Sequence, residues 1–209
     1  MAATETRLES RDGETALAHE LATEAAASVA DPAPLGLAAF ALTTFCLSLI
    51  NAGLAPKATQ PIVFGLALFY GGAAQLLAGM WEFRKGNTFG ATAFGSFGAF
   101  WLSFWAFEQF YASKVPKTDL KTAVGIFLLA WGIFTAYMFI ASLRTSPALV
   151  LVFATLTATF FLLAYGEMAD MESMVTYGGW MGIITAILAW YASMAGVVNA
   201  TFGKTVLPK

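Results

Sequence analysis

Charged residues are scarce in this chain of 209 residues, and cysteine and histidine are almost missing. Only 11% of the residues are Asp, Glu, Lys or Arg, against about a quarter in soluble globular domains. The net charge is −2 and no basic patch occurs, so nucleic acid is not an expected partner. With one cysteine, Cys46, and one histidine, His19, the chain has no intrachain disulfide and little support for a metal site.

Sequence motifs of enzymes are missing as well. The chain contains no HExxH, GxSxG or Walker sequence, and its glycine-rich stretches lie in apolar segments where phosphate binding is implausible. Residues 1–34 lack the apolar core of a signal peptide and carry several acidic residues. We therefore expect neither an enzyme nor a cofactor, and we predict that residues 1–34 form a polar cytoplasmic tail.

Six long apolar stretches dominate the remaining sequence. They are Leu35–Leu54, Pro61–Phe83, Thr88–Phe110, Ala123–Leu143, Ser146–Met168 and Tyr177–Phe202. Each is about as long as the ~20 residues that a helix needs to cross a bilayer. The alternation typical of barrel strands is absent. The sequence thus predicts an all-α membrane protein, in which residues 35–203 form a bundle of six transmembrane helices with a central pore.

The basic residues of the loops predict the orientation in the membrane. Six spans place both termini on one side, and residues 204–209 form a short C-terminal segment there. That side would collect Arg7, Arg11, Arg84, Lys85, Arg144, Lys204 and Lys209, against Lys57, Lys114, Lys117 and Lys121 on the other side. We expect an integral protein of the plasma (inner) membrane with both termini in the cytoplasm.

Neutral polar residues, rather than charges, occur inside the predicted spans. Glu82 and Glu108 stand only at span ends, which argues against a cation pump built on a buried carboxylate. Phe40, Thr43, Thr44, Ser48 and Asn51 share one helical face of the first span, and we interpret this stripe as pore lining. An isolated hydroxyl elsewhere more often bonds its own helix. Further candidate pore residues are Tyr70, Gln75 and Asn199.

Small residues and aromatic residues give the spans two further features. Gly65, Gly72 and Gly79, like Gly178, Gly182 and Ala186, recur at helical spacing and predict close helix packing or subunit contact. Phe40, Phe97 and Trp101 lie deep in their spans. Deep aromatic rings usually serve packing, but a ring of them can also form an apolar constriction.

Four blocks in order resemble one family. They are Asp-Pro-Ala-Pro-Leu-Gly-Leu at 31–37, the segment from Phe-Tyr-Gly-Gly-Ala-Ala-Gln at 69–75 to Lys-Gly-Asn-Thr-Phe-Gly at 85–90, Trp-Gly-Ile-Phe-Thr at 131–135, and the closing segment 199–208. Together they are similar to the acetate uptake transporters, which include the bacterial succinate–acetate permease and yeast acetate and ammonia-export proteins. The resemblance covers nearly everything from residue 31 onward.

The resemblance implies a fold, a substrate class and a constriction. It implies six helices per subunit, a homo-hexamer with a pore in each subunit, and acetate or another small monocarboxylate as substrate, with succinate as a further one. It also implies that Phe40, Phe97 and Leu156 form a narrow apolar neck. The chain departs from the family pattern at Asp31, where the signature has Asn, at Phe97, where relatives carry Tyr, and at Ala200, where the motif often has Glu.

Several functions stay open at this point. Acetate could pass as the anion through a channel, or as the protonated acid, in which case the proton travels with the substrate and no buried protein carboxylate is needed. A channel for a neutral solute such as ammonia or urea fits the polar stripes equally well. A membrane sensor that transports nothing, with the tail as its working part, is the third alternative.

Overall fold

The computed structural model of the chain describes residues 13–21 and 29–208, where every regular element is a helix. Residues 1–12, 22–28 and 209 lie outside this description, and so do the predictions made for them, including those for Arg7, Arg11 and Lys209. Residues 13–21 form a helix with exposed side chains. The predicted all-α architecture is confirmed for the described residues.

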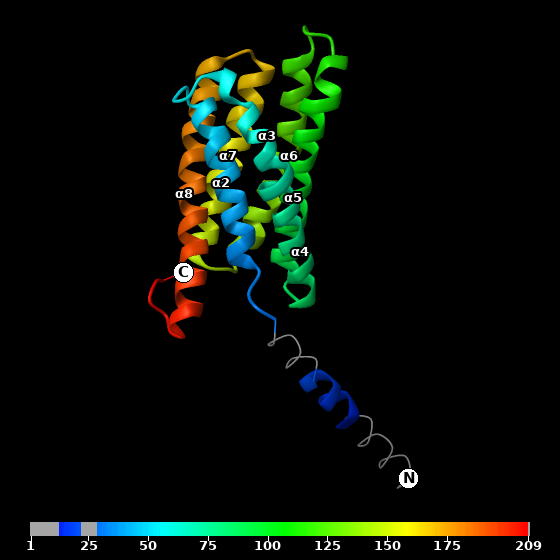
Figure 1. Cartoon of the computed structure of the whole chain (residues 1–209), viewed down its shortest axis with the longest axis vertical. Coiled ribbons are helices and arrows are strands. Elements are labelled where there is room, and N and C mark those ends of the chain that lie inside the picture. The colour runs from blue at the N-terminus through cyan, green and yellow to red at the C-terminus, as the bar shows by residue number, and fades with distance from the viewer. Residues whose placement is uncertain (1–12, 22–28, 209) are drawn as a thin grey trace.

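The helices of residues 33–202 run along a common long axis (Figure 1). They are α2 (Ala33–Asn51), α3 (Pro61–Leu68), α4 (Gln75–Arg84), α5 (Thr88–Ala106), α6 (Leu120–Ser142), α7 (Pro147–Met168) and α8 (Glu172–Phe202). Two π-helical segments interrupt or extend them: η2 (Phe69–Ala74) joins α3 to α4, and η3 (Phe107–Tyr111) continues α5. The start of α2, the turn from α4 to α5 and the end of α8 lie at the same end of the bundle, which we call the termini side.

Five helical segments of the described chain are long and apolar enough to cross a membrane. They are α2, the segment Lys57–Arg84 that contains α3, η2 and α4, and the helices α6, α7 and α8. Helix α5 is 19 residues long, but its glycine, serine, threonine and tryptophan residues lower its hydropathy. The count of six membrane spans therefore stays a prediction.

Two of the predicted spans differ most clearly from the observed helices, the last in its start and the second in its interior. The last helix begins at Glu172, five residues before the predicted Tyr177, and extends over 31 residues. An acidic residue is stabilised in the first turn of a helix by the helix dipole, so the acidic loop does not delay the start of α8. The second span contains a π-helical segment, Phe69–Ala74, in which the backbone hydrogen bonds run from i to i+5. The periodicity of the apolar residues does not predict such a segment.

Side-chain caps determine where α5 and α7 begin. The Asn87 side chain accepts a hydrogen bond from the backbone N–H of Gly90 at 3.1 Å. The Ser146 hydroxyl accepts one from the N–H of Leu149 at 3.4 Å, just before Pro147. Each cap satisfies a backbone donor that the helix itself leaves free. The first of these caps also positions a side chain of the candidate site.

Small residues allow the closest helix contacts, as predicted. A methyl group on Gly79 of α4 would lie 2.5 Å from the backbone nitrogen of Gly95 in α5. A methyl group on Gly182 of α8 would lie 2.2 Å from Oγ of Ser48 in α2. Gly65, in contrast, faces open space, with nothing within 4 Å of the corresponding position. The small-residue faces therefore hold α4 against α5 and α8 against α2 within the subunit.

Candidate functional site

Phe97 of α5 lies at the centre of a cluster of aromatic rings inside the bundle. Its side chain is 3% exposed. Its ring centroid lies 5.7 Å from that of Phe40 in α2 and 5.4 Å from that of Phe134 in α6. Phe153 and Phe160 of α7 lie at 6.1 and 6.4 Å. Rings from four helices thus meet at one place, which we call the aromatic layer.

The three predicted constriction residues belong to the same buried core. Phe40, Phe97 and Leu156 are each less than 5% exposed, and Leu156 lies on α7 between Phe153 and Phe160. The structure thereby brings together side chains that are more than 100 positions apart in the sequence. A layer made only of such side chains offers no partner to a charged solute.

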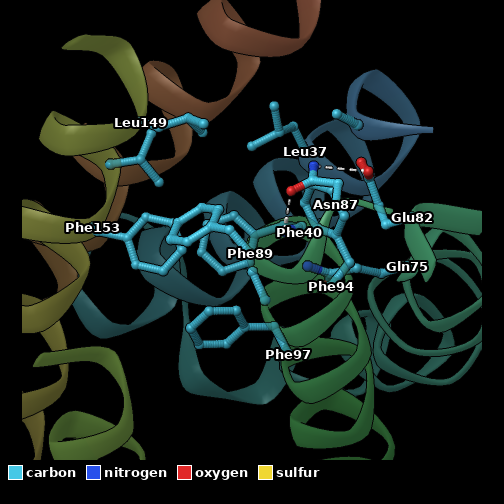
Figure 2. A pocket seen from close by; sticks show the side chains of 14 residues that line it. Leu37, Phe40, Gln75, Glu82, Asn87, Phe89, Phe94, Phe97, Leu149 and Phe153 are labelled. Atoms are coloured by element: carbon cyan, nitrogen blue, oxygen red, sulfur yellow. Dashed lines mark hydrogen bonds between the residues drawn. The ribbon is translucent and has the colours of Figure 1, made fainter. Parts of the chain in front are cut away.

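A small cavity lies on the termini side of the aromatic layer (Figure 2). Its volume is about 60 Å³, several times the ~10–15 Å³ that one water molecule requires. We call it the inner cavity. Its lining comprises Ala33, Leu37, Phe40, Gln75, Glu82, Asn87, Phe89, Gly90, Ala93, Phe94, Phe97, Leu149, Val152 and Phe153. The lining is therefore apolar except for three side chains.

Those three polar side chains come from α4 and from the turn that follows it. Gln75 and Glu82 are seven residues apart on one face of α4, so about 10 Å of helix separates them. Glu82 is fully buried, and Nδ2 of Asn87 donates a hydrogen bond to its Oε2 at 2.8 Å. Oε1 of Glu82 and Oε1 of Gln75 are buried and have no hydrogen-bond partner. Two residues that line the cavity thus each have a buried acceptor oxygen that lacks a donor.

Gly90 makes the close approach of Asn87 and Glu82 possible. A methyl group at Gly90 would lie 2.6 Å from Nδ2 of Asn87 and 2.8 Å from Cδ of Glu82. No real side chain fits at such distances. The first turn of α5 can therefore pack directly against the carboxyl group because it carries no side chain there.

A much larger cavity of about 870 Å³ lies at the opposite end of the bundle. We call it the outer vestibule. It is lined by Leu47, Ile50, Asn51, Gly53, Lys57, Gln60, Phe100, Ser103, Phe104, Phe107, Glu108, Leu120, Lys121, Ala123, Val124, Phe127, Leu128, Leu163, Glu167, Glu172, Ser173, Val175 and Thr176. Charged side chains of both signs lie at its wall, unlike in the inner cavity.

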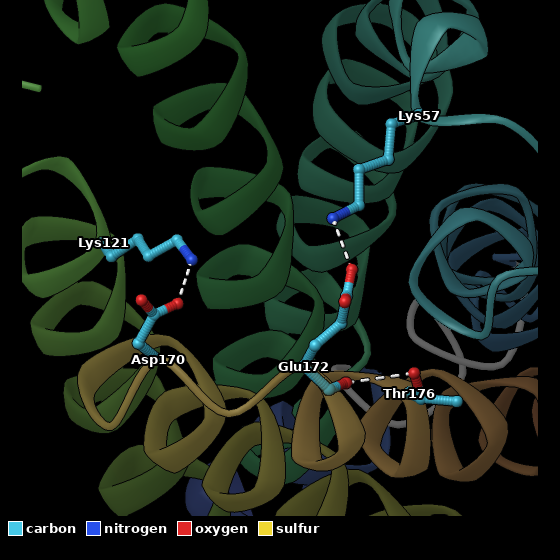
Figure 3. Close-up of polar contacts among 5 residues, drawn as sticks. All are labelled: Lys57, Lys121, Asp170, Glu172 and Thr176. Carbon is cyan, nitrogen blue, oxygen red and sulfur yellow. Dashed lines mark hydrogen bonds and ion pairs between the residues drawn. The ribbon is translucent and has the colours of Figure 1, made fainter.

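Ion pairs hold most of this charge at the mouth of the vestibule (Figure 3). Nζ of Lys57 lies 3.1 Å from Oε1 of Glu172, and Lys121 pairs with Asp170. All four side chains are exposed. Exposed pairs of this kind contribute only about 0–1 kcal/mol to stability. Their lysines remain available to attract an anion from solution.

Only one helical turn separates the two cavities along α5. Phe97 lines the inner cavity and Phe100 lines the outer vestibule. Three residues of α-helix correspond to a rise of about 4.5 Å. The ring of Phe100 is also in edge contact with Phe160 and Trp131, at centroid distances of 5.4 and 5.3 Å. The aromatic layer is thus a thin barrier between two spaces inside one subunit.

One face of α2 runs past the inner cavity, the aromatic layer and the outer vestibule. Leu37 and Phe40 line the inner cavity, while Leu47 and Asn51 line the vestibule. The steps of three or four residues between them place Thr44 on the same face, between Phe40 and Leu47. Thr44 is buried and its hydroxyl oxygen has no partner. A polar group therefore lies on this face at the level of the barrier.

The remaining candidate residues, Thr43, Tyr70 and Asn199, line neither cavity. The Thr43 hydroxyl donates to the carbonyl of Ala39 at 2.9 Å, and its Oγ1 would lie 2.6 Å from a methyl on Gly71. Tyr70 is partly buried in η2. The amide of Asn199 bonds the closing segment: Nδ2 donates to the carbonyl of Leu207 at 2.8 Å, and Oδ1 accepts from its N–H at 2.9 Å.

Sequence reasoning missed several residues of the site. The sequence places Glu82 at a span end beside basic residues, whereas the structure buries it in the cavity wall. Phe153, Leu156 and Phe160 recur at i, i+3 and i+7 on α7, and this stripe could have indicated the other half of the aromatic layer. An Asn directly before an apolar run is typical of an N-cap, but nothing in the local sequence shows that Asn87 also bonds Glu82.

Residues 13–21 and 29–208 contain no candidate metal site. No group of three or more His, Cys, Asp or Glu side chains in these segments lies close enough to hold a metal ion.

Comparisons with known proteins give a consistent result. The model of the GPR1/FUN34/yaaH family matches residues 14–209. The chain is 43% identical over 182 residues to the succinate-acetate/proton symporter SatP of Escherichia coli K12, covering 86% of this chain and 95% of that protein. It is 40% identical over 194 residues to acetate permease A of Emericella nidulans, covering 86% of this chain and 65% of the relative.

A solved structure has the same fold. The solved structure of the bacterial acetate channel SatP superposes on this chain with a TM-score of 0.81 at 41% sequence identity. The match covers 87% of this chain and 99% of the solved chain. The helices of this chain are therefore arranged as in that channel.

Proposed function

The chain belongs to the GPR1/FUN34/YaaH family, and we propose that it transports acetate and related small carboxylic acids, succinate among them, across a membrane. The observation that carries this proposal is the pair of cavities in line within one subunit, separated by the thin aromatic layer around Phe97. Transport rather than an enzymatic reaction is the activity for which relatives are named.

In the proposed path, the substrate meets different chemistry at each stage. Lys57 and Lys121 attract the anion at the vestibule, and Asn51 offers it a neutral amide. The dry neck of Phe40, Phe97 and Leu156 follows, with Thr44 as its polar group. Gln75 then receives the solute in the inner cavity. A direct substrate contact of Thr43, Tyr70 or Asn199 remains a prediction.

The neck favours passage of the acid with its proton. Moving a bare carboxylate into an apolar environment without hydrogen bonds costs many kcal/mol, whereas protonation removes most of this cost. We therefore propose proton-linked transport, which is symport in effect. An anion channel is the competing mechanism, in which the neck opens enough to admit water with the ion.

The proposal includes an arrangement in the membrane. Helix α5 crosses the bilayer as the sixth span, because it packs along α4 and η2 within the bundle. Both termini face the cytoplasm, and the membrane is the plasma (inner) membrane. Helix α6 is only 22% buried over its most apolar window, so lipid or neighbouring subunits must cover it. A homo-hexamer, as the family resemblance implies, provides such neighbours.

Labelled acetate uptake into liposomes that contain the purified protein tests the function. We expect flux above that of empty liposomes, and a faster flux when an inward proton gradient is imposed. Flux that does not respond to the gradient would favour the anion channel. Flux equal to that of empty liposomes would contradict acetate transport itself.

A further inference from the structure

Glu82 is a buried carboxyl group without a counter-ion, and the proposed path does not yet use it. Its side chain is 0% exposed, and Oε1 has no hydrogen-bond partner although Oε2 accepts from Asn87. Isolated buried carboxylates are costly, so such a group needs a proton or a donor from a ligand. Glu82 lines a cavity with room for a small solute, where a ligand can supply that donor.

The charged neighbours of Glu82 do not pair with it. Lys85, one turn further along the chain, bonds Asp31 through Nζ at 3.1 Å. Arg84 lies two positions from Glu82, on the other side of the helix, and is exposed. From α5 the carboxyl meets only the neutral Asn87 and Gly90, and the cavity-lining residues of α2 and α7 are apolar. Glu82 therefore forms no ion pair among the described residues.

We propose that Glu82 binds the carboxyl group of the substrate by sharing one proton with it. Two carboxylates within hydrogen-bond distance cannot both be ionised, so the complex contains one proton between the two groups. The proton arrives on the acid or is already on Glu82, and it leaves with the acid or returns to Glu82. This inference rests on the proposed function and adds to it a named residue that makes the inner cavity selective for a carboxylic acid plus one proton.

The amide of Asn87 gives this site its geometry. Because Nδ2 of Asn87 donates to Oε2 and Oδ1 of Asn87 accepts from the N–H of Gly90, Oε1 is the carboxyl oxygen that is left without a donor. A single free oxygen supports one short hydrogen bond to a single acid group. The rest of the cavity is apolar and accommodates the methyl group of acetate.

The pH dependence of acetate binding in the purified full-length protein tests the proposal. The variants are Glu82→Gln, which keeps the shape but donates hydrogen bonds without sharing a proton, and Asp119→Asn as a matched control in an exposed loop. Between pH 6 and 9, titration calorimetry with sodium acetate should show that the apparent Kd of the parent and of the control rises by up to about tenfold per pH unit. In Glu82→Gln the Kd should be almost independent of pH.

A second measurement counts the protons directly. At the upper end of the pH range, titrations in two buffers of different ionisation enthalpy should show about one proton taken up per acetate by the parent protein and none by Glu82→Gln. If Glu82→Gln fails to fold, Glu82→Asp provides the comparison, and it should retain proton uptake at a weaker affinity. The parent measurement needs no variant at all.

Two outcomes would overturn the assignment. One is a Kd in Glu82→Gln that keeps the pH dependence of the parent, because the proton would then reside on the acid alone. The other is acetate binding by the parent that is independent of pH over the whole range. Acetate flux in liposomes is measured separately. If either outcome is found while gradient-driven flux persists, this inference fails and the proposed function stands.

Discussion

The inner cavity and the outer vestibule differ in the number, exposure and pairing of their charged side chains. The vestibule is wide. Lys57, Lys121 and Glu172 are exposed at its mouth and paired, whereas Glu108 and Glu167 in its wall are half-buried. The inner cavity is small and apolar, and its one carboxyl group is buried without a counter-ion. Exposed charges attract and concentrate ions, whereas a buried polar group discriminates strongly between ligands that satisfy it and ligands that do not. We infer that the vestibule collects substrate and that the inner cavity and the neck select it.

Filling each space with the same side chain should give the largest difference. Ala93 lines the inner cavity and Ala123 lines the vestibule. We expect Ala93→Leu to reduce acetate uptake into liposomes to the level of empty liposomes, because the added atoms occupy the space that the substrate needs. Ala123→Leu should change uptake by no more than about twofold, as for an ordinary surface substitution. Equal loss in both variants would contradict the difference between the cavities.

Opening the barrier should change the selectivity. Phe97→Ala removes the ring around which the aromatic layer is built, and we expect the ratio of succinate to acetate uptake to rise by about tenfold. The same variant should lose about 3–5 kcal/mol of stability, since a large cavity is left behind. Phe83→Ala, at an exposed position, is the matched control. Succinate competition no better than in the parent would argue against Phe97 as a constriction.

A methyl group in the wall of the inner cavity should destabilise the protein. Gly90→Ala pushes against Asn87 and Glu82, so we expect a loss of about 1–3 kcal/mol from overpacking, together with weaker acetate binding. Gly65→Ala, where nothing lies within 4 Å, should be neutral or stabilising by up to about 1 kcal/mol. Thermal unfolding in detergent measures both. The contrast fails if the two variants have the same transition temperature.

Removing a charge from the vestibule should have the smallest effect. Lys57→Gln breaks the exposed pair with Glu172, and we expect a change in stability below about 1 kcal/mol. Acetate uptake should fall by about twofold at low ionic strength and by less in 0.15 M salt, where the Debye length is about 8 Å. A large loss of uptake that salt does not change would mean that Lys57 binds substrate directly.

The sequence predicted the helices better than it predicted the site. Long apolar runs specify α2, α6, α7 and α8, because a span must be apolar over its full length. Phe40, Asn51, Gln75 and Phe97 do line the two cavities. The first-span stripe, however, mixes two faces, since Ser48 packs against α8 at Gly182 and only part of the stripe reaches the cavities. A helical stripe spans a wide arc, and which part meets a cavity depends on the neighbouring helices.

Glu82 shows why the sequence did not predict the rest of the site. Its position next to Arg84 and Lys85 is typical of a solvated helix end. In the fold, Lys85 bonds Asp31 while α5 packs against Glu82 through Gly90. Burial of that carboxyl thus results from contacts between three segments, and no local pattern encodes them. The same holds for the π-helical turn before Gln75.

Cysteine accessibility tests most directly whether the acetate path runs through these two cavities inside one subunit. Ser103→Cys places a thiol in the vestibule and Ala93→Cys places one in the inner cavity, in a Cys46→Ala background that removes the native thiol. A membrane-impermeant thiol reagent should label the Ser103→Cys variant only from the side opposite the termini. It should label the Ala93→Cys variant only from the termini side, and acetate should slow the labelling of each variant from the side on which that variant is labelled. Equal labelling of the Ala93→Cys variant from the side opposite the termini, or no protection by acetate in either variant, would contradict a path divided by the aromatic layer.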